Sequence, residues 1–253
     1  MRDMRNLKVL ISYKGTAYHG FQRQTNAITI QEVLETAVEK LLKTKHSVIG
    51  CSRTDAGVHA REFCFNMKTM SAIPTVGFVK GLNALLPHDI AVKSCNEAEV
   101  DFHARYSAKS KEYSYLIHTG EIRDVFRGDS AFFYPRSLDV KTMNEVAELF
   151  IGEHNFSAYC KAESLEIVKS KKRGTVREIY SFNVQKYGDY IEMSVSGNGF
   201  LHNMVRIMAG TLVYVSEGKR CLYDVRESLL TGERELAGIT LPPQGLYLNR
   251  VEY

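Results

Sequence analysis

TIQEVLETAVEKLL (residues 29–42) decides the fold class, because its apolar residues recur at the three- and four-residue spacing of an amphipathic helix. Thr29 followed three residues later by Glu32 has the spacing of a capping box, which predicts a helix that begins at Ile30. Before this helix, KVLISY (8–13) has the composition typical of a strand. The sequence therefore predicts a mixed fold in which helices and strands alternate.

The first half of the chain continues this pattern up to about Asp101. Three further strands and a second helix are expected there, at 47–52, 62–67 and 91–94 for the strands and at 76–86 for the helix.

The second half of the chain repeats the mixture of strands and helices. KEYSYLIHT (111–119) and GLYLNRVEY (245–253) are expected strands, and Gly188-Asp189 is expected to turn the chain between strands at 181–187 and 190–196. Two helices are also expected. One carries Met143, Val146, Ala147, Phe150 and Ile151 on one face, and the other begins at about Phe200 and carries Leu201, Met204, Val205, Met208, Leu212 and Val215.

These elements predict an α+β fold of two comparable halves. The family resemblance that the motifs below carry implies two similar α/β subdomains, ferredoxin-like or RRM-like halves, that share a mostly antiparallel mixed sheet. We expect an N-terminal subdomain at 1–104, which carries an Asp-containing loop, and a C-terminal subdomain at 105–253. The active-site cleft is expected between the two halves.

Composition excludes several classes of protein. Of 253 residues, 44% are hydrophobic and 25% are charged, which is typical of a globular chain and excludes a disordered tail or a collagen-like repeat. The formal net charge of +4 is compatible with a polyanionic partner without proving one. No apolar run approaches the roughly 20 residues of a membrane helix, and the first residues lack a secretory core. Five scattered cysteines without a Cys-x-x-Cys pair indicate reduced thiols in a cytoplasmic protein and no zinc site.

The stretch GCSRTDAGVHAR (50–61) is the strongest candidate for chemistry. A loop can hold the Asp55 carboxylate at a cleft, Arg53 can reach an anion, and Gly57 permits a backbone conformation that other residues resist. An aspartate that only caps its own turn is the structural alternative. Standard phosphate loops and dinucleotide fingerprints are missing, since His202 occupies the third glycine position after Gly-Asn-Gly at 197–199.

RTDAGVHA is the signature that makes this chain resemble the TruA-type tRNA pseudouridine synthases. The resemblance extends over essentially the whole chain, although 126–175 matches only loosely and Ser52 stands where the family usually has glycine. It is carried, in the family's order, by YKGTAYHGFQRQ (13–24), NALLPHDIAV (83–92), DFHARYSAKSKEYSYLI (101–117), GNGFLHNMVRIMAGTL (197–212) and QGLYLNRVEY (244–253).

The resemblance implies an isomerase that converts uridine to pseudouridine at positions 38, 39 and 40 of the tRNA anticodon stem-loop, without a metal or a nucleotide cofactor. Asp55 is then the essential carboxylate, either as a nucleophile or as a base on the sugar, and Arg53 supports the flipped nucleotide. Tyr113 is the tyrosine that the family match selects to stack on the uracil. A strand tyrosine with its ring in the core is the structural alternative, and this alternative also fits Tyr115 on the same strand face. Arg206 would pair with Asp55 and keep it ionised, with His202 one helical turn earlier. Leu246 would form part of the apolar floor under the base.

The resemblance also implies partners. Arg105 is the best-supported contact to RNA, with Arg23, Lys109, Lys111 and the run KSKKR (169–173) as weaker candidates, and the family works as a homodimer on the anticodon arm of tRNA.

Two other functional classes of protein stay open. A non-catalytic protein that binds structured RNA would keep the fold without turnover. A hydrolase that uses Asp55 as a nucleophile would need a second carboxylate and a metal, and no Asp-x-Asp accompanies it.

Overall fold

The structure is a computed structural model that describes residues 4–170 and 174–253. Contacts divide the chain into two compact units. Unit 1 runs to Lys109 and includes Leu248–Tyr253, and unit 2 is Ser110–Tyr247. The predicted α+β class with mostly antiparallel strand pairs is confirmed within each unit.

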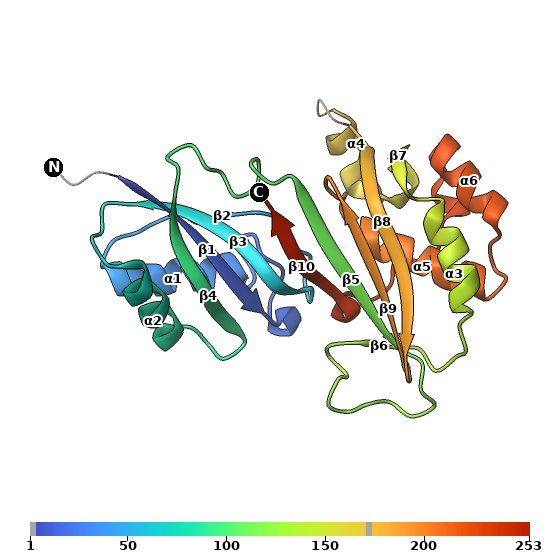
Figure 1. Ribbon diagram of the computed structural model, residues 1–253, viewed down its shortest axis with the longest axis horizontal. Helices are drawn as coiled ribbons and strands as arrows, with labels where there is room; N and C mark the ends of the chain where they lie inside the picture. The colour runs from blue at the N-terminus through green and yellow to red at the C-terminus, as the bar shows by residue number, and fades with distance from the viewer. Residues whose placement is uncertain (1–3, 171–173) are drawn as a thin grey trace. The chain divides into compact units, whose positions relative to one another are not determined.

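Unit 1 is built around β1, which lies between β4 and β3 and pairs antiparallel with both (Figure 1). The side chains of Leu7, Val9 and Ile11 alternate along β1 and are completely buried, as the period of two in a strand requires. The strands of this unit are β4 (Ile90–Ala98), β1 (Arg5–Tyr13), β3 (His59–Thr69) and β10 (Leu246–Glu252) in that order, with β2 (Ile49–Gly50) paired to β3. The expected final strand is therefore present, and its residues from Leu248 onward belong to unit 1.

The helices of unit 1 are α1 (Ile30–Leu42) and α2 (Thr75–Leu85), and a 3-10 turn, η1 (Gly15–Ala17), follows β1. The predicted start of α1 is confirmed, since the Thr29 hydroxyl accepts a hydrogen bond from the Glu32 amide at 3.4 Å. Gly81 lets the two helices approach closely, because a Cβ atom there would lie 2.6 Å from a methyl carbon of Leu41.

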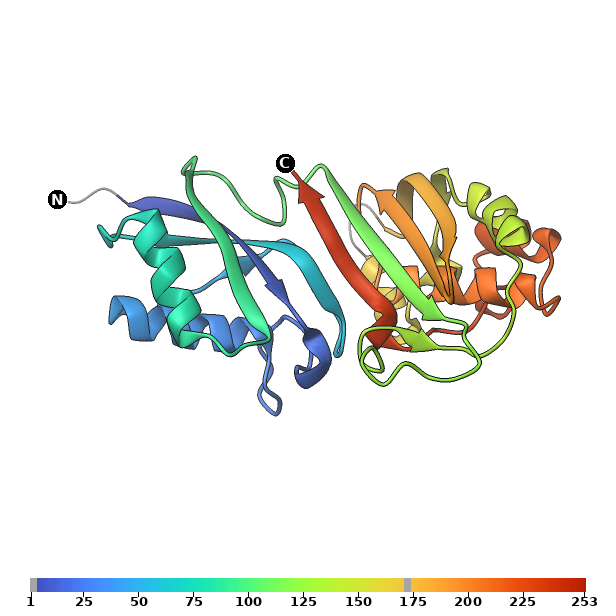
Figure 2. The ribbon, with the colours of Figure 1, turned by 60° about the horizontal axis from the view of Figure 1, so that its bottom comes forward.

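Unit 2 contains the strands β5 (Ser110–His118), β9 (Tyr190–Gly197), β8 (Val176–Tyr187) and β7 (Gly152–Asn155) in that order, and β6 (Phe132–Phe133) pairs parallel to β5. The predicted turn between β8 and β9 is confirmed, with Gly188 at a φ of 57°. Figure 2 shows the long connection between β5 and β6 as an extended loop.

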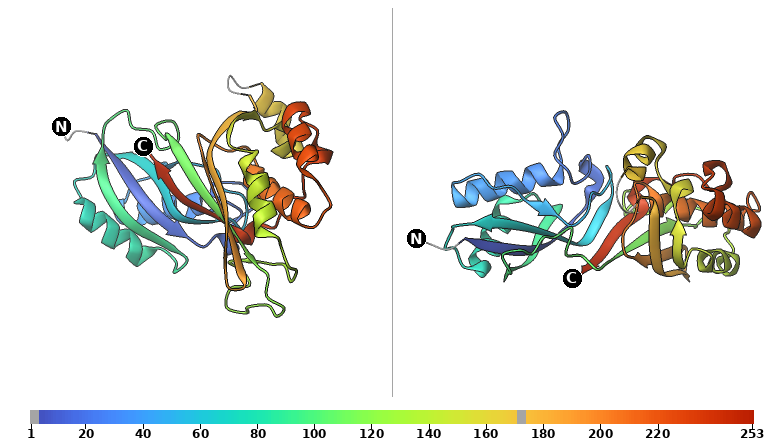
Figure 3. Two further views of the ribbon diagram at one scale, coloured as in Figure 1. Left: turned by 45° about the vertical axis from the view of Figure 1, so that its right-hand side comes forward. Right: turned by 90° about the horizontal axis from the view of Figure 1, so that it is seen from above.

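The helices of unit 2 are α3 (Val140–Glu148), α4 (Ala162–Lys169), α5 (Met204–Ser216) and α6 (Leu222–Thr231), with 3-10 turns η2 (Ser157–Tyr159), η3 (Arg234–Leu236) and η4 (Pro243–Gly245). In Figures 1 and 3, α3, α5 and α6 lie together on one side of β8 and β9. Among the residues that the structure describes, no helix has the length and apolar character needed to cross a membrane.

Two predicted helix boundaries are wrong. The helix expected from about Phe200 begins at Met204, because Asn203 has a left-handed backbone with a φ of 63° and interrupts the pattern. The helix expected to carry Ile151 ends at Glu148, and Ile151 is largely exposed. In both cases apolar residues continue the helical spacing beyond the helix, so spacing alone did not locate its end.

A carboxylate just after α5 holds the chain that leaves β6. Glu217 accepts hydrogen bonds from the Tyr134 hydroxyl at 2.6 Å and from Arg136 at 2.9 Å, and it pairs with Lys219 at 2.7 Å. Its side chain is only 9% exposed. These donors, Lys219 first among them, lower the pKa of Glu217 to about 2.

We expect Glu217→Gln to lower the free energy of unfolding by about 1–3 kcal/mol at pH 7, because the mutation removes a charge-assisted network. The folded pKa of about 2 lies below the ordinary 4.5, so the carboxylate stabilises the fold above pH 4.5 and loses this effect as the pH falls toward 2. Urea unfolding at a series of pH values measures the difference.

Glu163→Gln is the matched control, because Glu163 is mostly exposed and pairs with Lys161 at 3.7 Å, which is expected to matter little. A destabilisation by Glu217→Gln that is equal at pH 7 and pH 3 would contradict this account.

Candidate active site

The predicted loop lies between β2 and β3 and carries Asp55 on a tight turn. The Val58 amide donates to the Asp55 carbonyl at 3.2 Å and closes the turn. Gly57 has a φ of 78°, as the sequence indicated, so a residue with a side chain would be strained there. Asp55 is half-buried and Arg53 is exposed, so both side chains reach the surface of the loop.

The segment after β1 holds the chain immediately before Asp55. The Phe21 amide donates to the Thr54 carbonyl at 3.2 Å, and the hydroxyls of Tyr13 and Thr54 lie 2.9 Å apart. All three of these residues are buried. The backbone that leads to Asp55 is therefore fixed by both main-chain and side-chain hydrogen bonds.

The chain after Asp55 is held by Tyr18. The Gly57 amide donates to the Tyr18 carbonyl at 3.1 Å, and the Tyr18 hydroxyl donates to the Asp89 carboxylate at 2.6 Å. Asp89 also accepts the Lys14 amide on its own carbonyl at 2.8 Å. Burial and the adjacent Asp89 carboxylate raise the pKa of Tyr18, so this hydroxyl stays protonated as a donor.

Two glycines allow this packing of backbone against backbone. A Cβ atom on Gly20 would lie 2.5 Å from the Thr54 carbonyl oxygen, and one on Gly15 would overlap the carbonyl of Val58. Gly15 also donates its amide to Nδ1 of the buried His59 at 3.0 Å. No larger residue fits at either position without displacing the Asp55 turn.

Tyr18 and Asp89 were not selected individually from the sequence, although both lie in segments that carry the family resemblance. The available signals were weak, because a tyrosine in a polar loop and an aspartate after Leu-Pro-His are common in surface loops. Their pairing joins residues 71 positions apart, which no local pattern encodes.

The two tyrosines on one face of β5, Tyr113 and Tyr115, have different surroundings. Tyr115 is completely buried, and its hydroxyl donates to the Pro242 carbonyl at 2.6 Å. Tyr113 keeps 6% of its surface exposed and meets Phe200 edge-to-face at 5.1 Å. Tyr115 is therefore committed to the core of unit 2, whereas the ring of Tyr113 is fixed by an aromatic neighbour.

Arg206 lies on α5 and is half-buried. Its Nε donates to the Leu241 carbonyl at 2.7 Å, and a guanidinium nitrogen donates to the Asn203 side chain at 2.9 Å. The expectation that His202 precedes Arg206 on the same helix is wrong, because α5 begins after the left-handed Asn203. The Nδ1 of His202 lies 2.7 Å from the Ser164 hydroxyl instead.

Leu246 is the first residue of β10 and is buried. The preceding η4 packs tightly, since a Cβ on Gly245 would lie 2.7 Å from the ring of Tyr115. The predicted site residues are thus divided between the units. Tyr113, Arg206 and Leu246 belong to unit 2, and Arg53 and Asp55 belong to unit 1.

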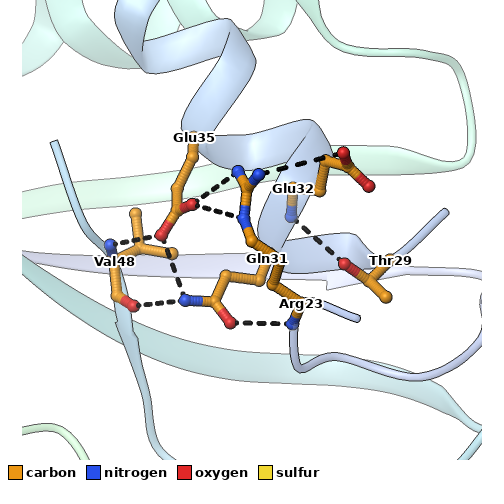
Figure 4. Close-up of polar contacts among 6 residues, drawn as sticks. All are labelled: Arg23, Thr29, Gln31, Glu32, Glu35 and Val48. Carbon is orange, nitrogen blue, oxygen red and sulfur yellow. Dashed lines mark hydrogen bonds and ion pairs between the residues drawn. The ribbon is translucent and has the colours of Figure 1, made fainter. Parts of the chain in front are cut away.

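Arg23 is part of an ion-pair network at the start of α1 (Figure 4). Two of its nitrogens donate to one Glu35 oxygen at 3.1 and 2.7 Å, and the other Glu35 oxygen accepts from Gln31 and from the Val48 amide. Glu32 lies 3.9 Å from a third nitrogen. The positive charge of Arg23 is therefore compensated within unit 1.

The other basic candidates lie where unit 1 ends. Arg105 and Lys109 are exposed, and the Lys109 amide donates to the Glu252 carbonyl at 2.8 Å. Lys111 is half-buried on β5. Of the basic run at 169–173, residues 171–173 lie outside the described part of the chain.

Comparisons with known proteins find consistent matches. The sequence model of the family described as tRNA pseudouridine synthase matches residues 9–107 and 146–253. A "tRNA pseudouridine synthase A" from Caldicellulosiruptor bescii is 42% identical over 250 residues, with 99% of this chain and 100% of the relative covered. Its namesake from Clostridium kluyveri is 44% identical with the same coverage. A chain of the Cbf5-Nop10-Gar1 complex is 15% identical, with 96% of this chain and 48% of that chain covered and a TM-score of 0.36, a likeness too weak to support an argument.

We expect Tyr18→Phe to loosen the Asp55 turn, because the mutation removes only the hydroxyl that donates to Asp89. The Gly57 amide should exchange with deuterium at least several-fold faster, and the free energy of unfolding should fall by about 1–3 kcal/mol. Mass-spectrometric hydrogen exchange of the peptide at 50–61 measures the effect. Tyr223→Phe on an exposed part of α6 is the control, and equal exchange in all three proteins would refute the role of Tyr18.

Proposed function

The chain belongs to the tRNA pseudouridine synthase family, and from this premise we propose that it modifies uridines 38, 39 and 40 in the anticodon stem-loop of tRNA. As a member of this family it is an isomerase that converts uridine in tRNA to pseudouridine. The three positions are supported by the resemblance of the sequence over its whole length to enzymes of this type.

Asp55 is the catalytic residue in this proposal. The observation that carries it is the RTDAGVHA turn, whose backbone is hydrogen-bonded on both sides of Asp55 to the segment that follows β1. Because the loop is already ordered, little conformational entropy is lost when the carboxylate takes up its reactive position. In the reaction the bond between C1′ and N1 breaks, the uracil turns, and a bond between C1′ and C5 forms. C5 loses its proton and N1 ends protonated. Asp55 acts either as the nucleophile or as the base on the sugar.

The remaining site residues support Asp55 and the base. Arg206 binds the substrate in this proposal, because a guanidinium can bind an anionic or polar group of the nucleotide. Tyr113 stacks on the uracil, and Leu246 supplies the apolar floor under it. Arg53 stabilises the flipped nucleotide, because a base within a helical stem is otherwise out of reach.

Basic side chains bind the RNA backbone in this proposal, with Arg105 as the main contact and Lys109 and Lys111 as weaker ones. Arg23 has a minor role because Glu35 compensates its charge. The enzyme acts as a homodimer in the cytoplasm in this proposal, in keeping with a tRNA substrate and with cysteines that all carry thiols.

Asp55→Asn is expected to abolish pseudouridine formation while tRNA binding stays within about threefold of wild type, because the amide keeps the size of the carboxylate and loses its basicity. Release of tritium from 5-tritiated uridine in tRNA measures turnover, and filter binding measures affinity.

Asp189→Asn, in the exposed turn between β8 and β9, controls for the substitution itself. Near-normal tritium release by Asp55→Asn would reject this assignment. Loss of release with retained binding excludes the alternative of a non-catalytic RNA-binding protein.

The affinity for tRNA is expected to fall steeply with salt. Each phosphate neutralised by a lysine or an arginine releases bound counterions, so about three to four contacts give a slope of roughly −3 in a plot of log K against log salt. Filter binding between 50 and 300 mM KCl, about the range over which such slopes are measured, checks this. A flat dependence would show that the exposed basic residues do not bind the RNA backbone.

A further inference from the structure

One turn of unit 1, at 102–107, presents an aromatic ring to solvent. The side chain of Tyr106 is 78% exposed, although a tyrosine ring gains stability from burial. Its ring centroid lies 4.3 Å from that of His103, with the two planes 33° apart. Arg105 next to it is also exposed. The turn connects β4 to β5 in Figure 1.

Hydrogen bonds within the turn fix this arrangement. The amides of Tyr106 and Ser107 donate to the His103 carbonyl at 3.0 and 2.9 Å. The His103 amide donates to the Ser107 hydroxyl at 3.1 Å, and Nδ1 of His103 accepts from the Arg105 and Tyr106 amides at 3.2 and 3.3 Å. The imidazole is thus held against the backbone, and the Tyr106 ring lies over it.

A buried polar network anchors the turn to the core of unit 1. The Ala104 amide donates to the Asn66 side chain at 2.8 Å, and the Ala104 carbonyl accepts from the Tyr253 hydroxyl at 2.9 Å. Asn66 in turn donates to Asn6 at 3.0 Å, and Asn6 donates to the Phe102 carbonyl at 2.9 Å. Because Asn6, Asn66 and Ala104 are buried and their polar groups are satisfied, the turn is a rigid support.

We propose that the exposed ring of Tyr106 stacks on an unpaired base of the RNA substrate, with Arg105 bound to an adjacent phosphate. The inference rests on the proposed function, which supplies an RNA with a single-stranded loop. Unpaired bases bind to proteins by stacking on tyrosine and histidine rings, and a neighbouring arginine neutralises the backbone. A ring that is already fixed in position loses little entropy on binding, which favours a rigid turn over a mobile loop.

The chemistry at the turn favours RNA over a protein partner. Arg105 and Lys109 are both exposed on this connection, so the ring is accompanied by positive charge. A protein-binding patch would instead need several contiguous apolar side chains. Val100 is the other large hydrophobic residue of this connection that is exposed. A second copy of the chain as the occupant is tested as a separate outcome.

The experiment compares tRNA binding by Tyr106→Ala, Tyr106→Phe and Arg105→Ala with wild type over a range of salt concentrations. Tyr106→Ala should weaken binding about 5- to 100-fold without a change in the salt slope, because stacking releases no counterions. Tyr106→Phe should bind like wild type, because it keeps the ring. Arg105→Ala should reduce the magnitude of the slope by about one. Tyr223→Ala is the matched control, because Tyr223 on α6 is also mostly exposed, at 67%.

Thermal unfolding accompanies each measurement, and an unchanged melting temperature of Tyr106→Ala shows that a loss of binding is not a loss of folding. Wild-type affinity of Tyr106→Ala overturns the inference, and so does an equal loss with Tyr106→Phe. A changed oligomeric state of Tyr106→Ala with unchanged tRNA affinity also overturns it and points to a second copy of the chain. Tritium release by the wild-type enzyme tests the proposed function separately, since an enzyme that is active and yet indifferent to Tyr106 contradicts only this inference.

Discussion

The close approach of two backbones in unit 1 is the constraint on which the candidate active site depends. The segment after β1 lies so near the Asp55 turn that Gly15 and Gly20 leave no room for a Cβ atom. This proximity lets the Tyr18 carbonyl accept the Gly57 amide and lets the Phe21 amide reach Thr54. A carboxylate on a short loop would otherwise sample many orientations, and each main-chain hydrogen bond removes some of that freedom. The conformation of the Asp55 turn therefore depends on two segments, the RTDAGVHA stretch itself and the glycine-containing segment after β1 that packs against it.

Close main-chain packing also occurs beside the predicted site residues of unit 2. Gly245 packs against the ring of Tyr115 just before Leu246, and Gly210 of α5 packs against the backbone at Ile239 one helical turn after Arg206. Arg206 itself reaches the Leu241 carbonyl in the same returning segment. In both units, close main-chain contacts fix the backbone beside a predicted site residue. The exposed turn at Tyr106 differs from these two places, because there a buried polar network supports a ring that faces solvent.

Much of the fold was predictable because its signals are local. The cap at Thr29, the alternation along β1 and the turn at Gly188 each depend on residues a few positions apart. No sequence pattern predicted β6, β7, α4 or α6, and the apolar spacing placed His202 on a helix that starts only after Asn203. The strands β6 and β7 have two and four residues, too few for a period to emerge. The start of α5 depends on the left-handed backbone of Asn203, and the spacing of apolar residues contains no information about that conformation.

The sequence by itself determined the α+β class, the stretch RTDAGVHA that contains Asp55, and the resemblance that family comparison then confirmed. Only the tertiary structure decided how Tyr115 is held in the core, how Asp89 reaches the Asp55 turn through Tyr18, and that the ring of Tyr106 is exposed to solvent. The physical reason is the separation along the chain between the residues that interact. Helices, caps and turns are set by neighbours in the chain, whereas the bond from Tyr115 to Pro242 joins residues 127 positions apart and exists only after the chain has folded.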